Sequence, residues 1–215
     1  MVKVSPSLLS ADFAHLAQEI ADVEAGGADS LHVDIMDGHF VPNITIGPVV
    51  VKWIAKVATV PLEAHLMISD PFKYAPEFVK AGVNGISFHP EAAKNPGEVL
   101  GFIKGLGVRA GIAINPDSNF ESFEPLVRQA DFLLVMTVFP GFGGQEFIES
   151  ALENVRKSAA IFKGDVGVDG GVSPETTPAV VSAGGNVLIA GSAIFGTRDR
   201  RAAIEGLRAA APVGG

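Results

Sequence analysis

Short apolar segments recur along the whole chain and are separated by segments with a helical pattern. The apolar segments have the length of buried strands, roughly four to eight residues, and several are rich in Val and Ile. The predicted strands lie near Val4–Leu8, Ser30–Ile35, Leu62–Met67, Gly85–His89, Val108–Ile114, Phe132–Met136, Val166–Asp169 and Val187–Ala190. The chain therefore offers eight strands of similar length, spread evenly from one end to the other.

The segments between these strands carry helix signals. One predicted helix runs from Asp12 to Ala25 and stops at a Gly-Gly pair. A second follows Asn95, with Pro96 at the first helical position. A third is predicted through Phe147, Ile148, Ala151, Leu152 and Val155, and a fourth begins at Ser173-Pro174.

Eight strands that alternate with helices within 215 residues predict an α/β protein, a single (β/α)₈ TIM barrel over residues 1–215. A doubly wound open sheet is the competing architecture. It does not explain why polar residues end so many different strands, whereas in a barrel these ends converge on one mouth. The glycine fingerprint of a dinucleotide-binding fold is also absent after the first strand.

Four ionisable residues close apolar strands: His32, Asp34, His65 and Asp169. Side chains repeat every two residues along a strand, so His32 and Asp34 point to the same face. A buried carboxylate needs a partner, and two imidazoles with two carboxylates suit Zn²⁺, Fe²⁺, Mn²⁺ or Co²⁺. We predict one divalent metal per chain, and two carboxylates that can also move protons.

Further residues at strand ends complete a predicted pocket. The three methionines other than Met1, which are Met36, Met67 and Met136, all lie at strand ends and predict an apolar wall. His89 also ends a strand and is predicted to contact either the substrate or the four-residue cluster.

Three glycine-rich segments predict a phosphate site, because glycine lets backbone N–H groups approach an anion. They are Gly141, Phe142, Gly143 and Gly144, followed by a helix from near Gln145; Gly170 and Gly171; and Gly191 and Ser192.

The composition limits the classes of partner that the chain can bind. A net charge of −8 and a pI near 5.1 argue against nucleic acid, which needs clustered Lys and Arg. The chain has no Cys, which excludes disulfides and thiolate metal sites. Neither a signal peptide nor a membrane-spanning run is found, so we expect a cytoplasmic protein without a membrane partner. We also expect a homo-oligomer.

At this point the chain resembles the ribulose-phosphate 3-epimerase family of barrels. The matching segments are SPSLLSADF, LHVDIMDGHFVPN, HLMI, PGFGGQ, VDGGV and AGSAIF, and they extend to about residue 196. The resemblance implies epimerisation at C3 of D-ribulose 5-phosphate and D-xylulose 5-phosphate, in the pentose phosphate pathway or Calvin cycle. It implies a divalent metal, Zn²⁺ first, with ligands at His32, Asp34, His65 and Asp169, and it implies Asp34 and Asp169 as the acid/base pair. It also implies a phosphate clamp from the glycine loops and Ser192, and substrate contacts at Ser7, Met36, His65, Met67, His89, Met136 and Asp169.

Two positions depart from the family pattern: Phe139 replaces a small polar residue, and Val168 replaces an acidic one. Three other functions compete with this one. One is a 3-epimerase for another ketose phosphate, such as allulose 6-phosphate. A decarboxylase or aldolase of the same superfamily is disfavoured, because LHVDIMDG lacks the Lys of a DxKxxD pattern. The third is a noncatalytic phosphosugar-binding barrel.

Overall fold

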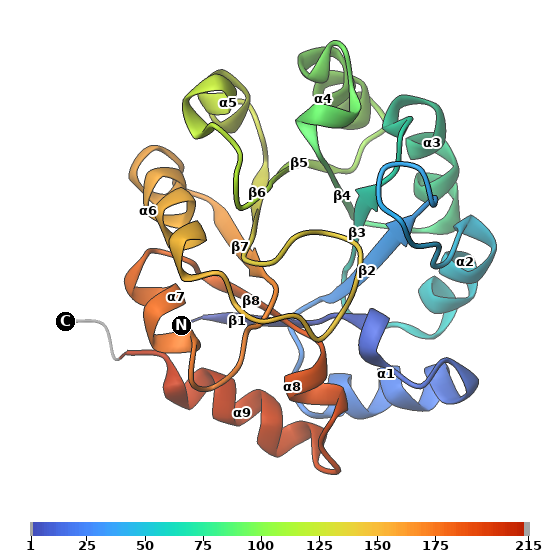
Figure 1. The fold of residues 1–215 in the computed structure, drawn as a ribbon. Helices are drawn as coiled ribbons and strands as arrows, with labels where there is room; N and C mark the ends of the chain where they lie inside the picture. The colour runs from blue at the N-terminus through green and yellow to red at the C-terminus, as the bar shows by residue number, and fades with distance from the viewer. Residues whose placement is uncertain (1, 213–215) are drawn as a thin grey trace.

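The predicted strands form one parallel sheet that curls into a barrel (Figure 1). The computed structural model describes residues 2–212. Neighbours pair in the order β1-β8-β7-β6-β5-β4-β3-β2, and a parallel bridge between Ser7 and His32 joins the two edges. The prediction of a (β/α)₈ barrel is confirmed. Its strands are β1 (Lys3–Pro6), β2 (Leu31–Met36), β3 (Leu62–Met67), β4 (Gly85–Phe88), β5 (Arg109–Ile114), β6 (Phe132–Met136), β7 (Asp165–Asp169) and β8 (Val187–Ala190).

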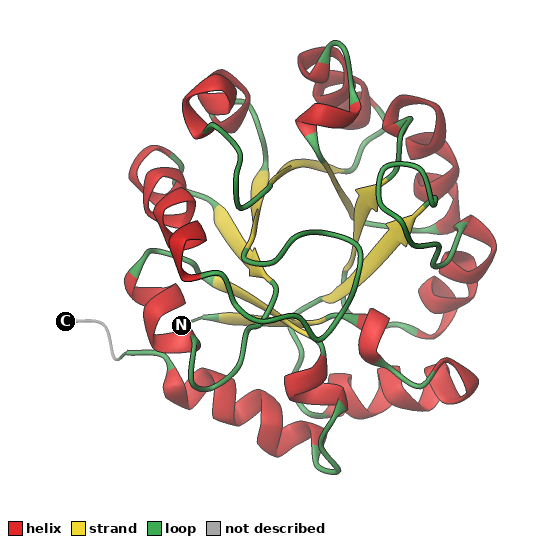
Figure 2. Ribbon diagram, in the orientation of Figure 1, coloured by secondary structure: helices red, strands yellow, loops and turns green. Residues whose placement is uncertain are grey.

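Helices surround the barrel on the outside (Figure 2). Four of them carry Pro in the first turn, where a missing N–H costs nothing: Pro48, Pro71, Pro96 and Pro178. The helices are α1 (Leu16–Ala25), α2 (Pro48–Val57), α3 (Pro71–Ala81), α4 (Pro96–Gly105), α5 (Phe120–Val127), α6 (Leu152–Ile161), α7 (Thr177–Ser182), α8 (Ser192–Phe195) and α9 (Arg200–Ala210). Among the described residues, no helix has the length and apolarity that crossing a membrane requires.

Successive side chains along each strand face alternately toward the helices and toward the barrel interior. In β7, Val166 and Val168 face outward and belong to the large apolar cluster beneath the helices. Gly167 lines the barrel interior and Asp169 lines the cavity at the mouth. At the opposite end of the barrel, Arg109 contacts Glu63 at 3.0 Å and Asp165 at 2.7 Å, which closes the interior with paired charges.

Several predicted boundaries are wrong. The first strand stops at Pro6, and Leu8–Ser10 forms a 3₁₀ turn in which the Ser10 N–H bonds the Ser7 carbonyl. The predicted helix at Asp12 begins as a 3₁₀ turn, and Asp12 caps it by accepting the Ala14 N–H at 2.9 Å. Its first apolar residue, Phe13, is 45% exposed rather than packed on the barrel.

Two helix starts were also placed too early. No helix begins near Gln145: a 3₁₀ turn starts at Glu149 and α6 starts at Leu152. Gln145 instead closes the preceding loop, because its side-chain amide donates to the carbonyls of Phe139 and Phe142. Likewise α7 begins at Thr177 rather than at Ser173, since Ser173–Thr176 form a hydrogen-bonded turn.

Candidate active site at the carboxyl ends of the strands

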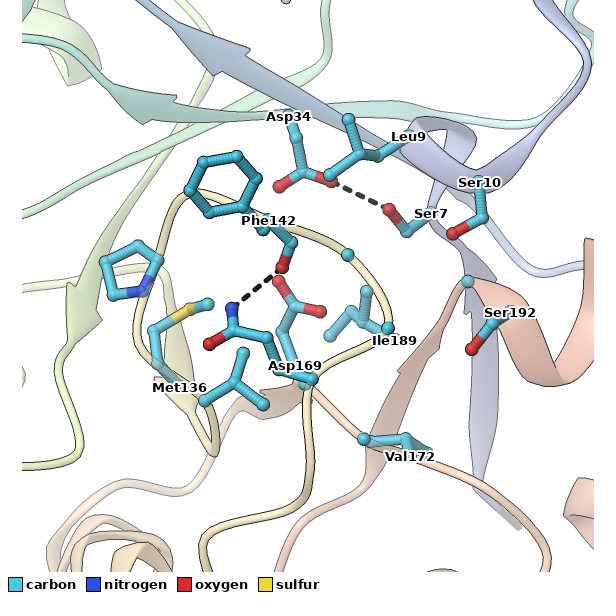
Figure 3. A pocket seen from close by; sticks show the side chains of 18 of the residues that line it. Ser7, Leu9, Ser10, Asp34, Met136, Phe142, Asp169, Val172, Ile189 and Ser192 are labelled. Atoms are coloured by element: carbon cyan, nitrogen blue, oxygen red, sulfur yellow. Dashed lines mark hydrogen bonds between the residues drawn. The ribbon is translucent and has the colours of Figure 1, made fainter. Parts of the chain in front are cut away.

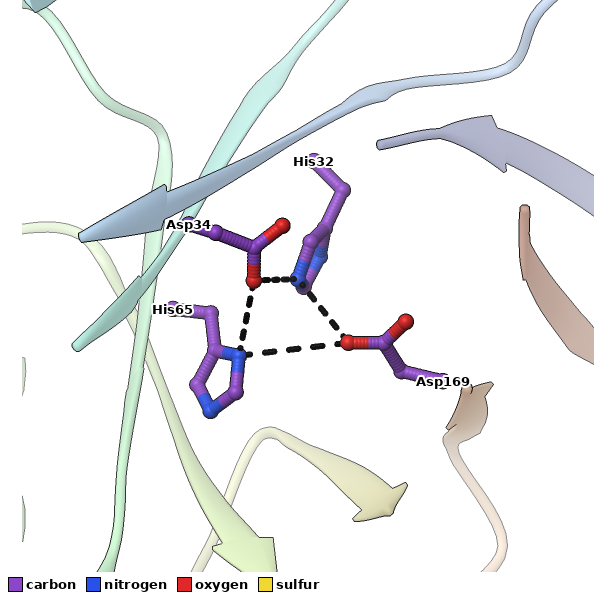
Figure 4. Close-up of side chains that lie close together, drawn as sticks. All are labelled: His32, Asp34, His65 and Asp169. Atoms are coloured by element: carbon purple, nitrogen blue, oxygen red, sulfur yellow. Dashed lines mark hydrogen bonds and ion pairs between the residues drawn. The ribbon is translucent and has the colours of Figure 1, made fainter. Parts of the chain in front are cut away.

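The four ionisable residues converge on one point inside the barrel mouth (Figure 4). One ligand-type atom from each of His32, Asp34, His65 and Asp169 lies within 4.8 Å of every other. Asp34 Oδ1 is 3.2 Å from His32 Nε2 and 3.1 Å from His65 Nδ1. Asp169 Oδ2 is 3.5 Å from His32 Nε2 and 4.0 Å from His65 Nδ1.

Sheet register creates this cluster. Asp34 lies directly opposite His65 in the β2–β3 pair, and His32 lies one inward position deeper. Asp169 ends β7, which is not a neighbour of β2 or β3 in the sheet. The two carboxylates therefore approach the centre from different sides of the barrel.

Burial makes the charges in the cluster depend on one another. Burial opposes ionisation of Asp34, but His32 and His65 outweigh this effect and lower the pKa of the carboxyl. Burial also opposes the charge on His32, yet Asp34 and Asp169 raise its pKa to about 9. Burial raises the pKa of Asp169 to about 7, and the charge of Asp34 adds to this rise while His32 opposes it. The two carboxyls thus differ in acidity although they share one site.

These residues could hold a metal ion. Two imidazole nitrogens and two carboxylate oxygens gather from three strands around one centre, and this donor set suits a transition metal or zinc. The cluster also contains two negative groups whose charge a divalent cation would balance. The donor set and its spacing therefore fit the predicted cofactor class.

A cavity of about 310 Å³ lies next to the cluster, with Asp34 and Asp169 in its lining (Figure 3). Asp34 and Asp169 face into it, and the three predicted methionines form part of its wall. Ser7 lines it as well, and its Oγ donates to Asp34 Oδ2 at 2.7 Å. The predicted lining residues that the structure places here are Ser7, Met36, Met67, Met136, Gly141, Phe142, Gly143, Gly144, Gly170, Gly171, Gly191 and Ser192.

All three glycine segments line this cavity. The loop after β6 crosses the barrel mouth in Figure 1, held there by a 2.7 Å bond from the Asn43 side chain to the Gly141 carbonyl. Gly170 adopts φ +114°, and a Cβ there would lie 2.5 Å from Val138, so this turn requires glycine. Among the described residues that line the cavity there is no Lys or Arg. An anion here would therefore be bound mainly by backbone N–H groups and hydroxyls.

His89 does not line the cavity. It is fully buried behind His65, and the two Nε2 atoms are 2.8 Å apart. Burial, followed by the charge of His65, lowers the pKa of His89 well below its usual value. The structure thus places His89 beside a cluster residue, the second of the two contacts that the sequence left open.

The sequence reasoning missed several lining residues. Ser10 is the most informative, because the 3₁₀ turn at Leu8–Ser10 returns it to the cavity beside Gly191 and Gly143. The other missed residues are Leu9, Val138, Pro140, Gln145, Val172, Ser173, Ile189 and Ala193. Of the two departures from the family pattern, Val168 faces the helices and Phe139 lies half exposed on the loop after β6.

A (β/α)₈ barrel with a metal-type cluster and a glycine-lined cavity at the carboxyl ends of its strands has the architecture of a barrel enzyme. The chain belongs to the ribulose-phosphate 3 epimerase family, whose model matches residues 3–195.

Individual relatives agree with this assignment. The chain is 50% identical to ribulose-phosphate 3-epimerase of Bacillus subtilis (strain 168), over 97% of this chain and 99% of that protein. It is 45% identical to the chloroplastic ribulose-5-phosphate-3-epimerase of Arabidopsis thaliana, over 96% of this chain and 76% of that protein. A solved structure of 3-hexulose-6-phosphate synthase superposes with a TM-score of 0.70 at 23% identity, covering 99% of this chain and 100% of that chain, and this likeness shows the fold alone.

Proposed function

We propose that this chain interconverts D-ribulose 5-phosphate and D-xylulose 5-phosphate by moving a proton at C3. The observation that carries the proposal is the placement of Asp34 and Asp169 on separate sides of one centre at the floor of the cavity. Inversion at C3 requires removal of a proton from one face and its return to the other. Membership of the family and the names of its members support the same reaction.

In this proposal one aspartate removes the C3 proton and the other returns a proton to the opposite face. Asp34 Oδ1 faces the two imidazoles, which leaves Oδ2, the oxygen held by Ser7, for proton transfer. Asp169 likewise has one oxygen directed to the imidazoles. Because the two carboxyls differ in acidity, they can occupy opposite protonation states at neutral pH, as a single proton transfer requires.

The proposed cofactor is one divalent cation per chain held by His32, Asp34, His65 and Asp169, with Zn²⁺ first among Zn²⁺, Fe²⁺, Mn²⁺ and Co²⁺. When bound, it supplies Lewis-acid stabilisation of the negative charge that develops on the substrate oxygens. The methionine wall keeps water from the carbanionic carbon, because Met36, Met67 and Met136 are all at least 96% buried.

We propose that the substrate phosphate binds against the glycine segments. Ser192 and Ala193 begin α8, where helix geometry leaves backbone N–H groups without partners inside the helix. Ser10 and Ser192 both line the cavity and lie on the same side of it in Figure 3. A phosphate bound at these segments, away from the cluster, orients C3 over the carboxylates.

The direct experiment is an epimerase assay on five- and six-carbon ketose phosphates, before and after treatment with a chelator. Turnover of D-ribulose 5-phosphate that chelation removes and Zn²⁺ restores supports the proposal. A preference for allulose 6-phosphate would move the assignment to another ketose phosphate. If the chain binds these sugar phosphates but turns over neither, it would be a noncatalytic barrel.

We also propose that copies of the chain associate into a homo-oligomer. Support comes from α2, where Val49 is 76% exposed, Trp53 61% and Val57 46%, and the four-residue spacing places them on one helix face. Sedimentation velocity of the native chain against Trp53→Glu tests this, since the variant should dissociate toward monomer. A monomeric native chain would reject it.

A further inference from the structure

A second histidine lies behind the cluster and contacts one of its members. His65 directs Nδ1 toward Asp34 and Asp169, and its other ring nitrogen, Nε2, lies 2.8 Å from Nε2 of His89. The two rings are tilted by 38° with their centroids 5.0 Å apart. His89 therefore bonds the back of His65 and has no place on the cavity wall.

The backbone holds His89 at this point. Ser87 pairs with His65 in the β3–β4 register, and His89 follows two residues later on the same face. Its carbonyl accepts the Ala92 N–H at 3.0 Å in the turn that follows, and Pro90 restricts the chain between them. The contact is thus a consequence of strand pairing rather than of a mobile loop.

We propose that His89 is a positioning residue that sets the tautomer and ring orientation of His65 for binding the cation through Nδ1. This inference rests on the proposed metal site. A neutral imidazole has one N–H donor and one bare acceptor nitrogen. If His65 Nδ1 binds a cation, the ring proton of His65 must be on Nε2. This N–H then donates to His89. His89 Nε2 is consequently the acceptor, and the His89 proton must be on Nδ1.

The surroundings of His89 favour this neutral acceptor form. The ring is fully buried, and the Phe40 ring packs against it with the two ring centroids 5.0 Å apart. In the part of the chain that the structure describes, the ring bonds His65 and no carboxylate that would favour an imidazolium. A metal-bound histidine needs an acceptor for the N–H of its other ring nitrogen. Such acceptors fix the orientation and the basicity of the ligand.

The unpartnered nitrogen of His89 argues against a role in packing alone. His89 Nδ1 is buried and has no hydrogen-bond partner among the described residues. A buried polar atom without a partner is costly, and an apolar side chain would fill the same space without that cost. The contact with His65 gives a reason for an imidazole at this position.

The same hydrogen bond should reverse when the cation is removed. His65 Nδ1 can then donate to Asp34 Oδ1 at 3.1 Å, so that Nε2 becomes the acceptor and His89 the donor. The pair carries two protons in both arrangements, and only their positions differ. Metal loading should therefore change the tautomer of His89 even though His89 does not touch the metal.

The first test is ¹⁵N NMR of protein labelled at its five histidines, with and without Zn²⁺, where protonated and bare ring nitrogens resonate far apart. A His89→Gln spectrum assigns the His89 signals. We expect the Zn²⁺-loaded protein to hold His65 as the Nε2–H form and His89 as the Nδ1–H form. A His89 that carries its proton on Nε2 in the loaded protein, or on both nitrogens, would overturn the inference.

The second test is Zn²⁺ affinity by competition with a chromophoric chelator. His89→Phe removes the acceptor and should weaken binding by about 10–100-fold, the range typical of losing an outer-shell partner. His89→Gln retains an acceptor oxygen and should recover most of that loss. Phe78→Leu, a truncation in the helix layer on α3, controls for lost stability and should leave Zn²⁺ affinity unchanged.

The outcomes separate the two proposals. A native chain that binds no Zn²⁺ would reject the metal site, and the role of His89 with it. A native chain that binds Zn²⁺ with the same affinity as His89→Phe would reject the role of His89 and leave the metal site standing. If His89→Phe does not fold, His89→Gln and the spectrum of the native chain decide, since a change of tautomer with Zn²⁺ does not depend on any variant.

Discussion

The two oxygens of Asp34 have different partners. Oδ2 accepts the Ser7 hydroxyl at 2.7 Å, whereas Oδ1 lies 3.1–3.2 Å from the His65 and His32 rings. Ser7 stands at the seam of the barrel, where its backbone bridges to His32. The serine thus orients the carboxylate so that one oxygen faces the cluster and the other faces the cavity.

Ser7→Ala should lower kcat by about tenfold while the chain remains folded. Loss of a hydrogen bond to a charged group costs roughly 1.5–3 kcal/mol, and about 1.4 kcal/mol corresponds to a factor of ten. Steady-state kinetics on D-ribulose 5-phosphate measure the effect. Ser30→Ala removes a similarly buried hydroxyl, which donates to Ser5 at 2.9 Å away from the cavity, and should leave kcat unchanged. Equal loss in both variants would contradict the assigned role of Ser7.

Zn²⁺ affinity should rise with pH between about pH 6 and 8. The cation binds deprotonated imidazole, and the pKa of His32 is raised to about 9, so each bound Zn²⁺ must displace at least one proton in this range. Displacing the His32 proton alone changes affinity by about tenfold per pH unit, and below pH 7 the slope should steepen because Asp169, whose pKa is about 7, must also lose its proton. Competition with a chelator at several pH values measures the slope. A pH-independent affinity would show that His32 is not a ligand.

Gly143→Asp should raise KM for the phosphorylated ketose sharply without destabilising the fold. A Cβ at Gly143 meets its nearest neighbour, Ser10 Oγ, at 3.7 Å, so a side chain fits, and the new carboxylate would repel a phosphate bound nearby. Gly143→Asn is the matched neutral control and should have a much smaller effect. Native chain and variants should be compared on D-xylulose and D-xylulose 5-phosphate. If Asp and Asn raise KM equally, the phosphate lies elsewhere.

Asp37 should contribute to stability at neutral pH and lose this contribution in acid. It accepts the N–H groups of Ser69, His39 and Phe40 and the Ser69 hydroxyl, joining the loops after β2 and β3. Burial opposes its charge, but these hydrogen bonds outweigh burial and lower its pKa. The contribution is therefore present above the unfolded pKa near 4 and disappears as pH falls through the lower folded pKa.

Asp37→Asn should consequently lower Tm by about 2–4 °C at pH 7, and the difference from the native chain should narrow in acid. Thermal unfolding from pH 7 down to pH 3 measures both effects. Asp117→Asn, at an exposed loop carboxyl, serves as the control. A Tm difference that stays constant over this range would mean that the charge of Asp37 does not stabilise the fold.

The barrel and its central cluster could be predicted because they depend on local periodicity and on one topological rule. His32 and Asp34 share a face through the two-residue repeat, and parallel strand ends meet at one mouth, which brings in His65 and Asp169. These constraints do not depend on how the loops fold. The cluster was therefore placed correctly from four positions in the chain.

The loops could not be predicted in the same way, because long-range side-chain contacts decide them. Gln145 was expected to start a helix, yet its amide closes the loop after β6. Ser10 was missed because a 3₁₀ turn, not a continued strand, carries it back to the cavity. The place of His89 behind His65 depends on the β3–β4 register, which the order of strands along the chain does not specify.

The two-aspartate account is tested most directly by exchange of the C3 proton in D₂O. Asp34→Asn and Asp169→Asn should be saturated with Zn²⁺, with bound metal measured in the same samples, and given each epimer in turn. Epimerisation should fall by at least about 10²-fold in both variants. Each variant should retain exchange at C3 of one epimer only, and the two variants should retain opposite epimers, because each keeps the base on one face. Near-native epimerisation by either metal-loaded variant, or exchange of the same epimer by both, would contradict the account.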